Sequence, residues 1–182
     1  DIDPHANQPP GTLICSEEEI MEMHVVTGIA FSKDEAQISV RQIEDKPGVA
    51  AAIFGPLADA NINVDMIVQN IANEAATDVT FTVPSADLAR SLDVLAQAKA
   101  EIGYADLVHD PRVAKISVVG IGMRSHVGVA RKMFRCLSEE GINIQMISTS
   151  EIKTSVVIDE KYMELAVRAL HRAFDLDQPA AA

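Results

Sequence analysis

The chain has 182 residues, of which 48% are hydrophobic, and this fraction is large enough to build a folded core. Its formal net charge is −12, and it has no cluster of Lys and Arg, so nucleic acids and anionic membrane surfaces are poor candidate partners. No apolar run approaches the ~18 residues needed to span a bilayer, and the first residues lack the pattern of a signal peptide.

Two stretches near the start of the chain are predicted to be strands. An apolar run occupies residues 25–31. In residues 36–43, Ile38 and Val40 point to one face and polar residues to the other, which is the period of a strand. After a short turn, apolar spacing predicts a helix over residues 49–60.

The next elements complete a β-α-β-β-α-β order, the split βαβ arrangement. Strands are predicted over residues 62–68, 79–83 and 105–109, with a helix that starts after the candidate cap Ser85. The residues of the first of these strands that we expect to face the helices are Ile62, Val64, Met66 and Val68.

The sequence of this unit then recurs in the second half of the chain, which indicates an internal duplication. The order of the matches is kept, with a two-residue insertion before Gly128 and a three-residue deletion before Thr154. The matched segments are Ile38–Val40 with Ile116–Val118, Gly48–Ala50 with Gly128–Ala130, Ile62–Asn63 with Ile142–Asn143, Met66–Ile67 with Met146–Ile147, Thr77 and Val79 with Thr154 and Val156, and Leu88–Ala89 with Leu165–Ala166.

The second copy lacks its last strand. It has predicted strands over residues 115–121, 142–148 and 154–158 and helices over 128–140 and 160–174, and then the chain ends in a short tail. The unassigned run 25–31 is available to supply the missing strand. We therefore expect two interlocked α+β units of ferredoxin-like topology. The first repeat comprises residues 36–110, and the second repeat comprises residues 25–31 with 113–175, followed by a tail over 176–182.

The sheet face away from the predicted helices carries unusually little charge. A solvated face usually carries Lys and Glu, so we expect another sheet to cover this one, within the chain or across a dimer. The residues expected on this outer face are Asn63, Asp65, Ile67, Thr80, Thr82, Asn143, Gln145, Ile147, Ser155 and Val157.

The turn Asp45–Gly48, directly before a helix, is the best candidate binding site. Free amides and the helix dipole favour a carboxylate there, and Asp45 could hold an ammonium group, so the pair would suit an amino acid. An ordinary turn, with Pro47 as the first helical residue and Asp45 as a cap, explains the same residues. The repetition of Asn63 as Asn143 marks a second candidate element.

Other chemistries find no support in the sequence. The five histidines are dispersed, no Cys/His cluster suggests a metal, and no nucleophile–base motif suggests catalysis. Gly120-Ile121-Gly122 lacks the further glycine and lysine of a phosphate cradle, so it is expected to be an ordinary turn. Cys15 and Cys136 are far apart without a CxxC motif, which fits free thiols in the cytoplasm.

Several long segments closely resemble the regulatory part of bacterial aspartate kinases, and together they cover about residues 11–175. They occur in the family's order and spacing. These segments are Val25–Ala30, Asp45–Gly48, Ala60–Asn70, Thr77–Thr82, Val119–His126 and Ile147–Ile152.

The resemblance implies two tandem ACT domains that bind lysine, threonine or both as feedback inhibitors of aspartate kinase. It implies that residues 1–24 are a linker from an upstream catalytic domain, and that this catalytic domain, absent here, would hold ATP and Mg²⁺. The fragment itself would be no enzyme and would need no cofactor. Its expected partners are the effector amino acids, a second copy in a homodimer, and the aspartate kinase catalytic domain or subunit.

By resemblance, each effector site forms where the first repeat of one chain meets the second repeat of its partner. Val127 stands where many relatives have Pro, so the loop of the second site is expected to be less rigid. The first site, most simply for threonine, would use Asp45, Pro47, Gly48, Ala50, Gln69, Asn143 and Ile144. The second site, of the lysine type, would use Asp65, His126, Val129, Ser150 and Glu151.

Two alternatives of other classes remain open from the sequence. The chain could be a stand-alone amino-acid-sensing or assembly module for another enzyme or regulator, which the segment upstream of Asp1 would decide. It could also be a small enzyme on a ferredoxin-like scaffold, which would require turnover by the isolated chain. An RNA-binding role is disfavoured by the charge and by the lack of aromatic stacking residues on the strands.

Overall fold

A single six-stranded antiparallel sheet, in the order β2-β3-β1-β4-β6-β5, forms the framework of the protein. The computed structural model describes residues 25–73, 76–124 and 128–177. The strands are β1 Gly28–Glu44, β2 Ile67–Asn73, β3 Ala76–Pro84, β4 Asp106–Val119, β5 Met146–Thr149 and β6 Lys153–Asp159. The helices are α2 Val49–Asp59, α3 Leu88–Gln97, α4 Lys99–Ile102, α5 Val129–Glu139 and α6 Met163–Ala173, with short 3₁₀ turns η1 Ser85–Asp87, η2 Ile121–Arg124 and η3 Glu160–Tyr162.

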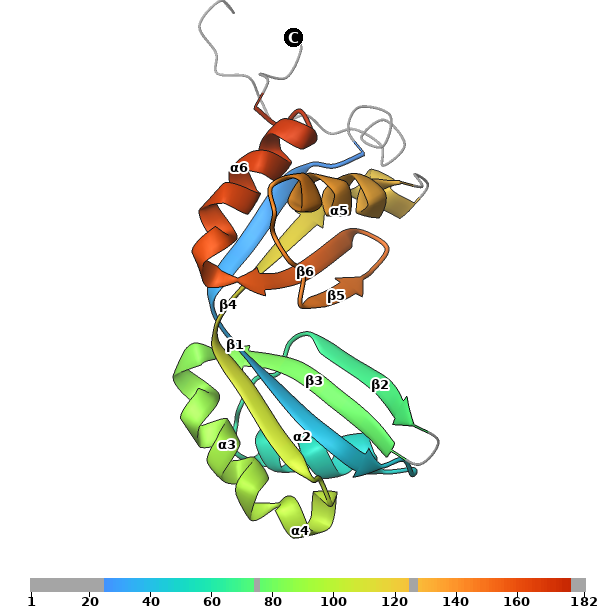
Figure 1. Ribbon diagram of the computed structural model, residues 1–182, viewed down its shortest axis with the longest axis vertical. Coiled ribbons are helices and arrows are strands. Elements are labelled where there is room, and N and C mark those ends of the chain that lie inside the picture. Colours follow the sequence, from blue (N-terminus) through green and yellow to red (C-terminus); the bar gives the residue numbers. More distant parts are fainter. Residues whose placement is uncertain (1–24, 74–75, 125–127, 178–182) are drawn as a thin grey trace, which may run out of the picture.

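The sheet is divided into two halves, each with its own helices (Figure 1). Helices α2, α3 and α4 pack on the half that contains β2 and β3, and α5 and α6 pack on the half that contains β5 and β6. Each half has the strand order of a split βαβ unit. The prediction of two ferredoxin-like α+β units is therefore confirmed.

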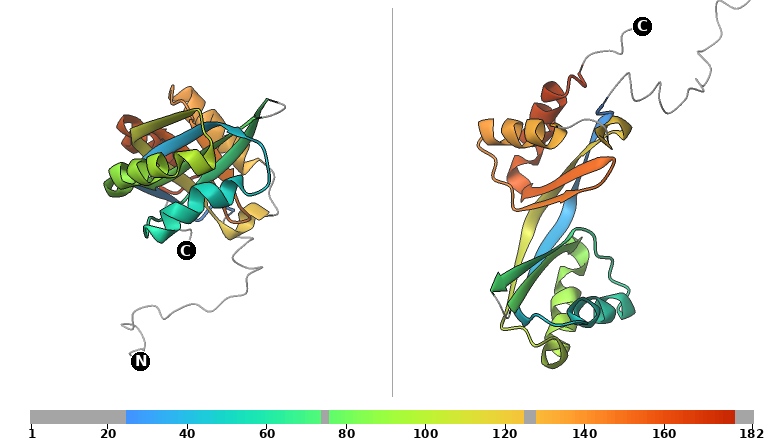
Figure 2. Two further views of the ribbon diagram at one scale, coloured as in Figure 1. Left: turned by 90° about the horizontal axis from the view of Figure 1, so that it is seen from below. Right: turned by 90° about the vertical axis from the view of Figure 1, so that its right-hand side faces the viewer.

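The two halves share the long strands β1 and β4. The first part of β1, residues 28–32, pairs with residues 115–119 of β4, whereas residues 37–41 of β1 pair with residues 106–110 of β4. Figure 2 shows both strands running from one half into the other. Each long strand thus serves as the first strand of one repeat and the fourth strand of the other, so the two units are interlocked.

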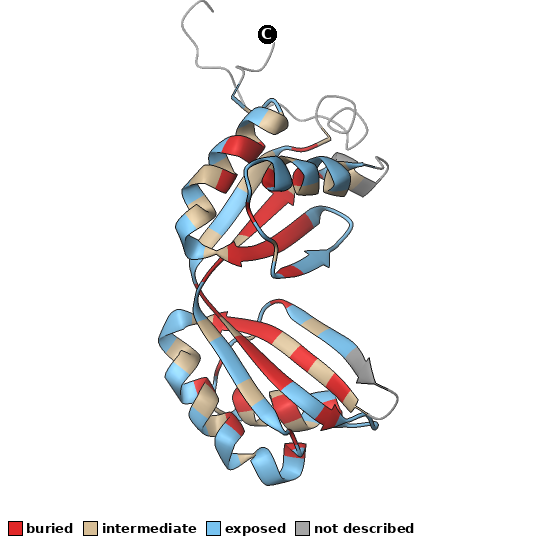
Figure 3. Ribbon diagram, viewed as in Figure 1, coloured by how far each residue is buried: buried red, intermediate tan, exposed pale blue. Residues whose placement is uncertain are grey.

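Each repeat has a separate apolar core between its helices and its part of the sheet. Figure 3 shows the buried residues along the central strands and on one side of the helices. In the first core, the rings of Phe54 and Phe81 meet edge to face, with centroids 5.2 Å apart. The second core is centred on fully buried Ile116, Met133 and Leu170.

Residues 25–32 run beside the second repeat, and we call them the crossing segment. Gly120 allows this segment to approach the end of β4 closely. A Cβ atom at this position would lie 2.1 Å from the carbonyl oxygen of Val25 and 2.8 Å from Cα of Val26. The Gly120 amide donates to the carbonyl of Ile152 at 2.9 Å. The glycine therefore has a packing function, in line with its expected place in an ordinary turn.

The predicted orientation of the second strand is wrong. Ile67 pairs with buried Phe81 and so lies on the helix-covered face, whereas Met66 and Val68 lie on the opposite face. Strand β2 begins only at Ile67, and the preceding loop turns the chain after Ile62, which packs in the first core. The alternation that starts at Ile62 therefore does not continue into the strand.

The predicted alignment of the two repeats also needs a correction after β2. Ile67 pairs with Phe81, and Ile147 pairs with Val156, so Phe81 and Val156 occupy equivalent positions. The offset between the repeats falls from 80 residues at Ile67 and Ile147 to 75 at Phe81 and Val156. The hairpin of the second repeat is therefore shorter by five residues, not three.

Part of the predicted outer face is covered within the chain by the other repeat. Thr82, Ser155 and Val157 are buried. Met66 of the first repeat and Met146 of the second pack together in a third apolar cluster. We call this contact region the junction; its residues are Glu35, Gln37, Asp65, Met66, Thr82, Val113, Lys115, Gln145, Met146 and Val157.

Candidate functional site

The turn Asp45–Gly48 leads from β1 into the N-terminus of α2. Gly48 has φ 99°, a left-handed conformation that favours glycine, and no side chain caps the helix. The first amides of a helix lack intrahelical acceptors, and the helix dipole adds positive potential there. The Val49 amide faces the carbonyl of Lys46 at 3.4 Å, and the amides that follow it are candidate donors for a carboxylate.

In the second repeat, Gly128 directly precedes α5, as Gly48 precedes α2. Gly128 has φ 110°, and no side chain among the described residues caps the helix. A Cβ at Gly48 or Gly128 would meet no atom of the described residues within 4 Å, and the left-handed backbone conformation accounts for both glycines. The structure thus repeats a left-handed glycine at the N-terminus of a helix, at the two places where the sequence repeats glycine.

The residues expected at the first site divide into two groups in one chain. Asp45, Pro47, Gly48 and Ala50 are exposed around the turn, and exposed Gln69 lies on the face of β2 that α2 covers. The other group, exposed Asn143 and half-buried Ile144, directly precedes Gln145, which bonds to β6 at the junction.

The two groups are far apart along the shared strand β1. The junction contacts β1 at Glu35, in the middle of the strand, whereas the turn follows Glu44, the last residue of β1. Nine residues of strand span about 30 Å. One chain therefore does not bring Asn143 and Ile144 to the turn.

The residues expected at the second site are also separated. Ser150 lies beyond β5, where its amide donates to the carbonyl of Lys153 at 2.7 Å. Asp65 contacts Lys115, and Lys115 pairs with Val157 of β6. Val157 lies four residues along this strand from Lys153, the residue that Ser150 contacts, and four residues of strand span about 13 Å. Val129, which begins α5, and exposed Glu151 belong to the second repeat, and His126 and Val127 lie outside the described residues.

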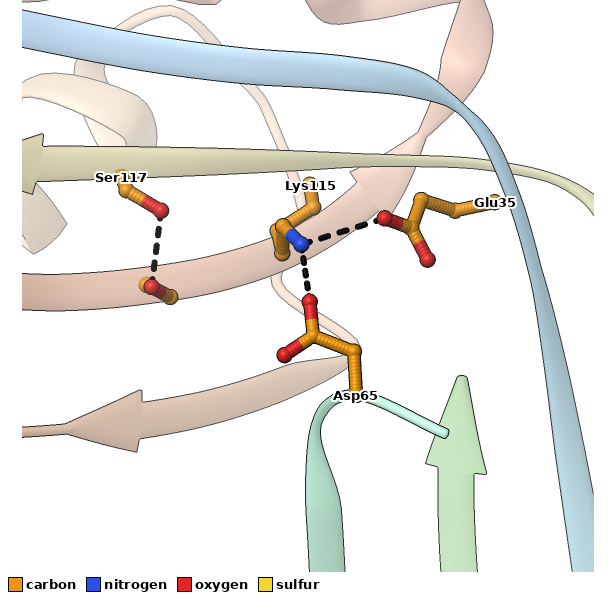
Figure 4. Close-up of polar contacts among 5 residues, drawn as sticks. Glu35, Asp65, Lys115 and Ser117 are labelled. Atoms are coloured by element: carbon orange, nitrogen blue, oxygen red, sulfur yellow. Dashed lines mark hydrogen bonds and ion pairs between the residues drawn. The ribbon is translucent and has the colours of Figure 1, made fainter. Parts of the chain in front are cut away.

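An ion cluster at the junction was not predicted from the sequence. The Lys115 ammonium lies between the carboxylates of Glu35, 3.1 Å away, and Asp65 (Figure 4). Burial by itself lowers the pKa of Lys115, but hydrogen bonds to Asp65 and Glu35 outweigh it and raise the pKa above the ordinary lysine value of 10.5. Lys115 joins the two repeats because Asp65 belongs to the first and Lys115 to the second.

A sequence signal for this cluster does exist. Lys115 interrupts the apolar run Val113–Val119, and Glu35 directly precedes the buried part of β1. Charged residues inside such strands are seldom buried unless they are paired.

The charged residues on the surface of α5 and α6 are explained by ion pairs within the chain. A hollow of about 450 Å³ between α5 and α6 is lined by charged residues, but Arg135 pairs with Glu139 and Arg172 lies 3.9 Å from Glu140. In the described part of the chain, no group of three His, Cys, Asp or Glu residues is arranged to hold a metal ion. Nor does any helix there have the length and apolar character to span a membrane.

Comparisons with known proteins identify the relatives of this fold. The family model described as "ACT domain" matches residues 34–98 and 116–174. The aspartokinase of Pseudomonas aeruginosa PAO1 is 58% identical over 173 residues, which are 94% of this chain and 42% of that protein. The chain thus spans well under half the length of this curated relative.

Two solved structures match almost over their whole length. The crystal structure of aspartokinase alpha and beta subunits is 61% identical with a TM-score of 0.78, covering 82% of this chain and 99% of the matched one. The ligand-free regulatory subunit of aspartate kinase from Thermus thermophilus is 42% identical with a TM-score of 0.77 and the same coverage. This chain therefore belongs to the ACT-domain family and is the regulatory portion of an aspartate kinase, without the catalytic domain.

Proposed function

We propose that this chain is a cytoplasmic allosteric module that binds threonine, lysine or both and mediates feedback inhibition of aspartate kinase. The observation that supports this most directly is the left-handed glycine at a helix N-terminus in each repeat, Gly48 before α2 and Gly128 before α5. Such a terminus binds the carboxylate of an amino acid, and exposed Asp45 lies three residues from Gly48 to receive its ammonium group.

A homodimer would complete both sites. Each set of expected site residues is divided between parts of one chain that lie far apart, so a second copy must supply the missing group. The sheet ends in the edge strands β2 and β5, which carry Ile67 and Ile147, exposed by 51% and 45%. An open edge with apolar side chains favours pairing with another chain.

Effector binding between two chains would then couple to the catalytic domain. An effector shifts an enzyme only through its different affinities for the active and inactive arrangements, and such coupling is typically on the order of 1–3 kcal/mol. Because the module contributes the effector sites and not the chemistry, changes at these sites should weaken inhibition and leave catalysis largely intact.

Asp45→Ala should lower the affinity for the effector of the first site at least tenfold. A charge-assisted hydrogen bond contributes roughly 1.5–3 kcal/mol, and 1.4 kcal/mol corresponds to a factor of ten. Isothermal titration of the purified chain with threonine and with lysine measures this. Asp93→Ala removes the same charge from the exposed surface of α3 and should bind as wild type does. Unchanged affinity for both amino acids in Asp45→Ala would place the site in a different loop.

Ser150→Phe should weaken lysine binding at least tenfold and leave threonine binding unchanged, because the ring adds bulk only at the second site. Ser150 is exposed, and its hydroxyl donates only to the nearby carbonyl of Lys153 at 3.3 Å, so the fold should tolerate the change. Ser138→Phe puts the same ring on the exposed side of α5 and is the matched control. Equal loss of both effectors in Ser150→Phe would show that the two sites are not separate.

A further inference from the structure

The two repeats are equivalent at the junction, position by position. Ile38 on β1 pairs with Phe81, and Ile116 on β4 pairs with Val156, the residue equivalent to Phe81. Ile38 and Ile116 are therefore equivalent. It follows that the preceding residue on β1, Gln37, is the counterpart of Lys115 on β4.

The partner of Lys115 has a counterpart as well. The Asp65 amide donates to the carbonyl of Thr82 at 3.0 Å, and the Gln145 amide donates to the carbonyl of Val157 at 2.8 Å. Thr82 and Val157 follow the equivalent residues Phe81 and Val156. Asp65 and Gln145 are therefore equivalent in the two repeats.

The exchange of β1 and β4 between the repeats relates the two halves by an approximate two-fold axis. Met66 and Met146, the residues after Asp65 and Gln145, pack in one apolar cluster, so this axis passes close to both loops. Lys115 reaches from the second repeat to Asp65 of the first (Figure 4). The same geometry aims Gln37 of the first repeat at Gln145 of the second.

The side-chain oxygen of Gln37, Oε1, is an unsatisfied hydrogen-bond acceptor among the residues that the structure describes. Within this part of the chain it is buried without a hydrogen-bond partner, and so is the hydroxyl of Thr82, the residue that pairs with Gln37 across the sheet. Buried polar atoms almost always have a partner, and an unsatisfied one is destabilising. Gln145 is exposed, and its carboxamide has the N–H groups that Gln37 Oε1 lacks.

We propose that Gln145 donates to Gln37 across the junction and forms a second, uncharged contact that is the twin of the Lys115–Asp65 ion pair. The two sides of the junction then differ. In the arrangement seen here the Lys115–Asp65 ion pair is formed. The Gln37–Gln145 hydrogen bond forms when the repeats rotate slightly about the shared strands. The contact sets the angle between the repeats, whichever effector the module binds.

A double-mutant cycle on the whole chain tests the proposal. Gln37→Lys with Gln145→Asp copies the existing ion pair onto the other side of the junction. If the two side chains meet, the unfolding equilibrium constant of the double variant is at least tenfold smaller than the two single changes predict when combined. Denaturant unfolding of the four proteins gives this number. Gln37→Lys with Gln97→Asp, at the exposed end of α3, is the matched control and should show no coupling.

A second pair covers the case in which Gln37→Lys prevents folding because it buries a charge. Gln37→Glu with Gln145→Lys places the ammonium on the exposed partner and makes the same contact with reversed charges, so the same tenfold coupling is expected. Spin labels on α2 and α5 should also show a narrower distance distribution in the coupled double variant. Coupling equal to that of the control in both pairs would overturn the proposal and would leave the Thr82 hydroxyl, which faces Gln37 across the sheet, or water as the donor to Gln37.

Discussion

Lys115→Met should lower the free energy of unfolding by roughly 3 kcal/mol, because removal of one partner leaves a buried charge uncompensated. Glu35 is only 8% exposed, and Lys115 is its ion-pair partner. Denaturant unfolding of the purified chain measures the loss. Lys153→Met, on the exposed part of neighbouring β6, should change stability by no more than about 0.5 kcal/mol.

A second variant separates charge from packing. In Lys115→Met with Glu35→Gln the buried carboxylate is also neutralised, so much of the lost stability should return. If the double variant is as unstable as Lys115→Met, the lysine stem and not its charge stabilises the junction. Wild-type stability in Lys115→Met would show that the ion cluster has no role in holding the repeats together.

Alkaline pH should also lower the free energy of unfolding of the wild-type chain, because it removes the charge of Lys115. The pKa of Lys115 is raised in the folded protein, so its contribution is fully present below the ordinary value of 10.5 and is lost as the pH rises through the higher folded value. The difference in unfolding free energy between wild type and Lys115→Met should therefore shrink above pH 10.5. A constant difference across that range would contradict the ion pair.

Gly120→Ala should lower the free energy of unfolding by about 3 kcal/mol and the melting temperature by on the order of 10 °C. The new methyl group would overlap the carbonyl of Val25, and backbone atoms cannot rotate away as a flexible side chain can. The crossing segment would have to move, and Val26, a buried member of the second core, would move with it.

Gly28→Ala is the matched control for this prediction. Gly28 begins β1 in the same crossing segment, but a Cβ there would meet no atom within 4 Å. Differential scanning calorimetry of both variants should show a large fall in melting temperature for Gly120→Ala and little change for Gly28→Ala. Equal melting temperatures would mean that the close approach of Val25 to Gly120 does not constrain the fold.

These expected results bear on how an effector signal could travel. The repeats are joined by two shared strands, one small apolar cluster and the ion cluster of Lys115. Under the proposed function, a signal that passes from one repeat to the other would cross these contacts. Variants at the junction should then alter inhibition although they do not touch an effector.

The sequence by itself determined the elements and their order. The duplication, the order of helices and strands and the missing strand of the second copy depend on local patterns, and the fold agrees with them apart from the orientation of the second strand and the length of the second hairpin. The ends of two helices are local as well: Asn61, with φ 55°, and Gly141, with φ 69°, adopt the left-handed conformation that Asn and Gly tolerate after a helix. The candidate turns before α2 and α5 follow from glycines for the same reason.

Only the tertiary structure decided which faces and charges meet. A period of two cannot be followed through an irregular loop, so the orientation of Met66 and Ile67 depended on where β2 pairs with β3. The contact of Lys115 with Asp65 joins residues 50 positions apart, and no local pattern fixes such a distance. The separation of the expected site residues within one chain has the same cause, because it depends on how far the shared strands hold the two repeats apart.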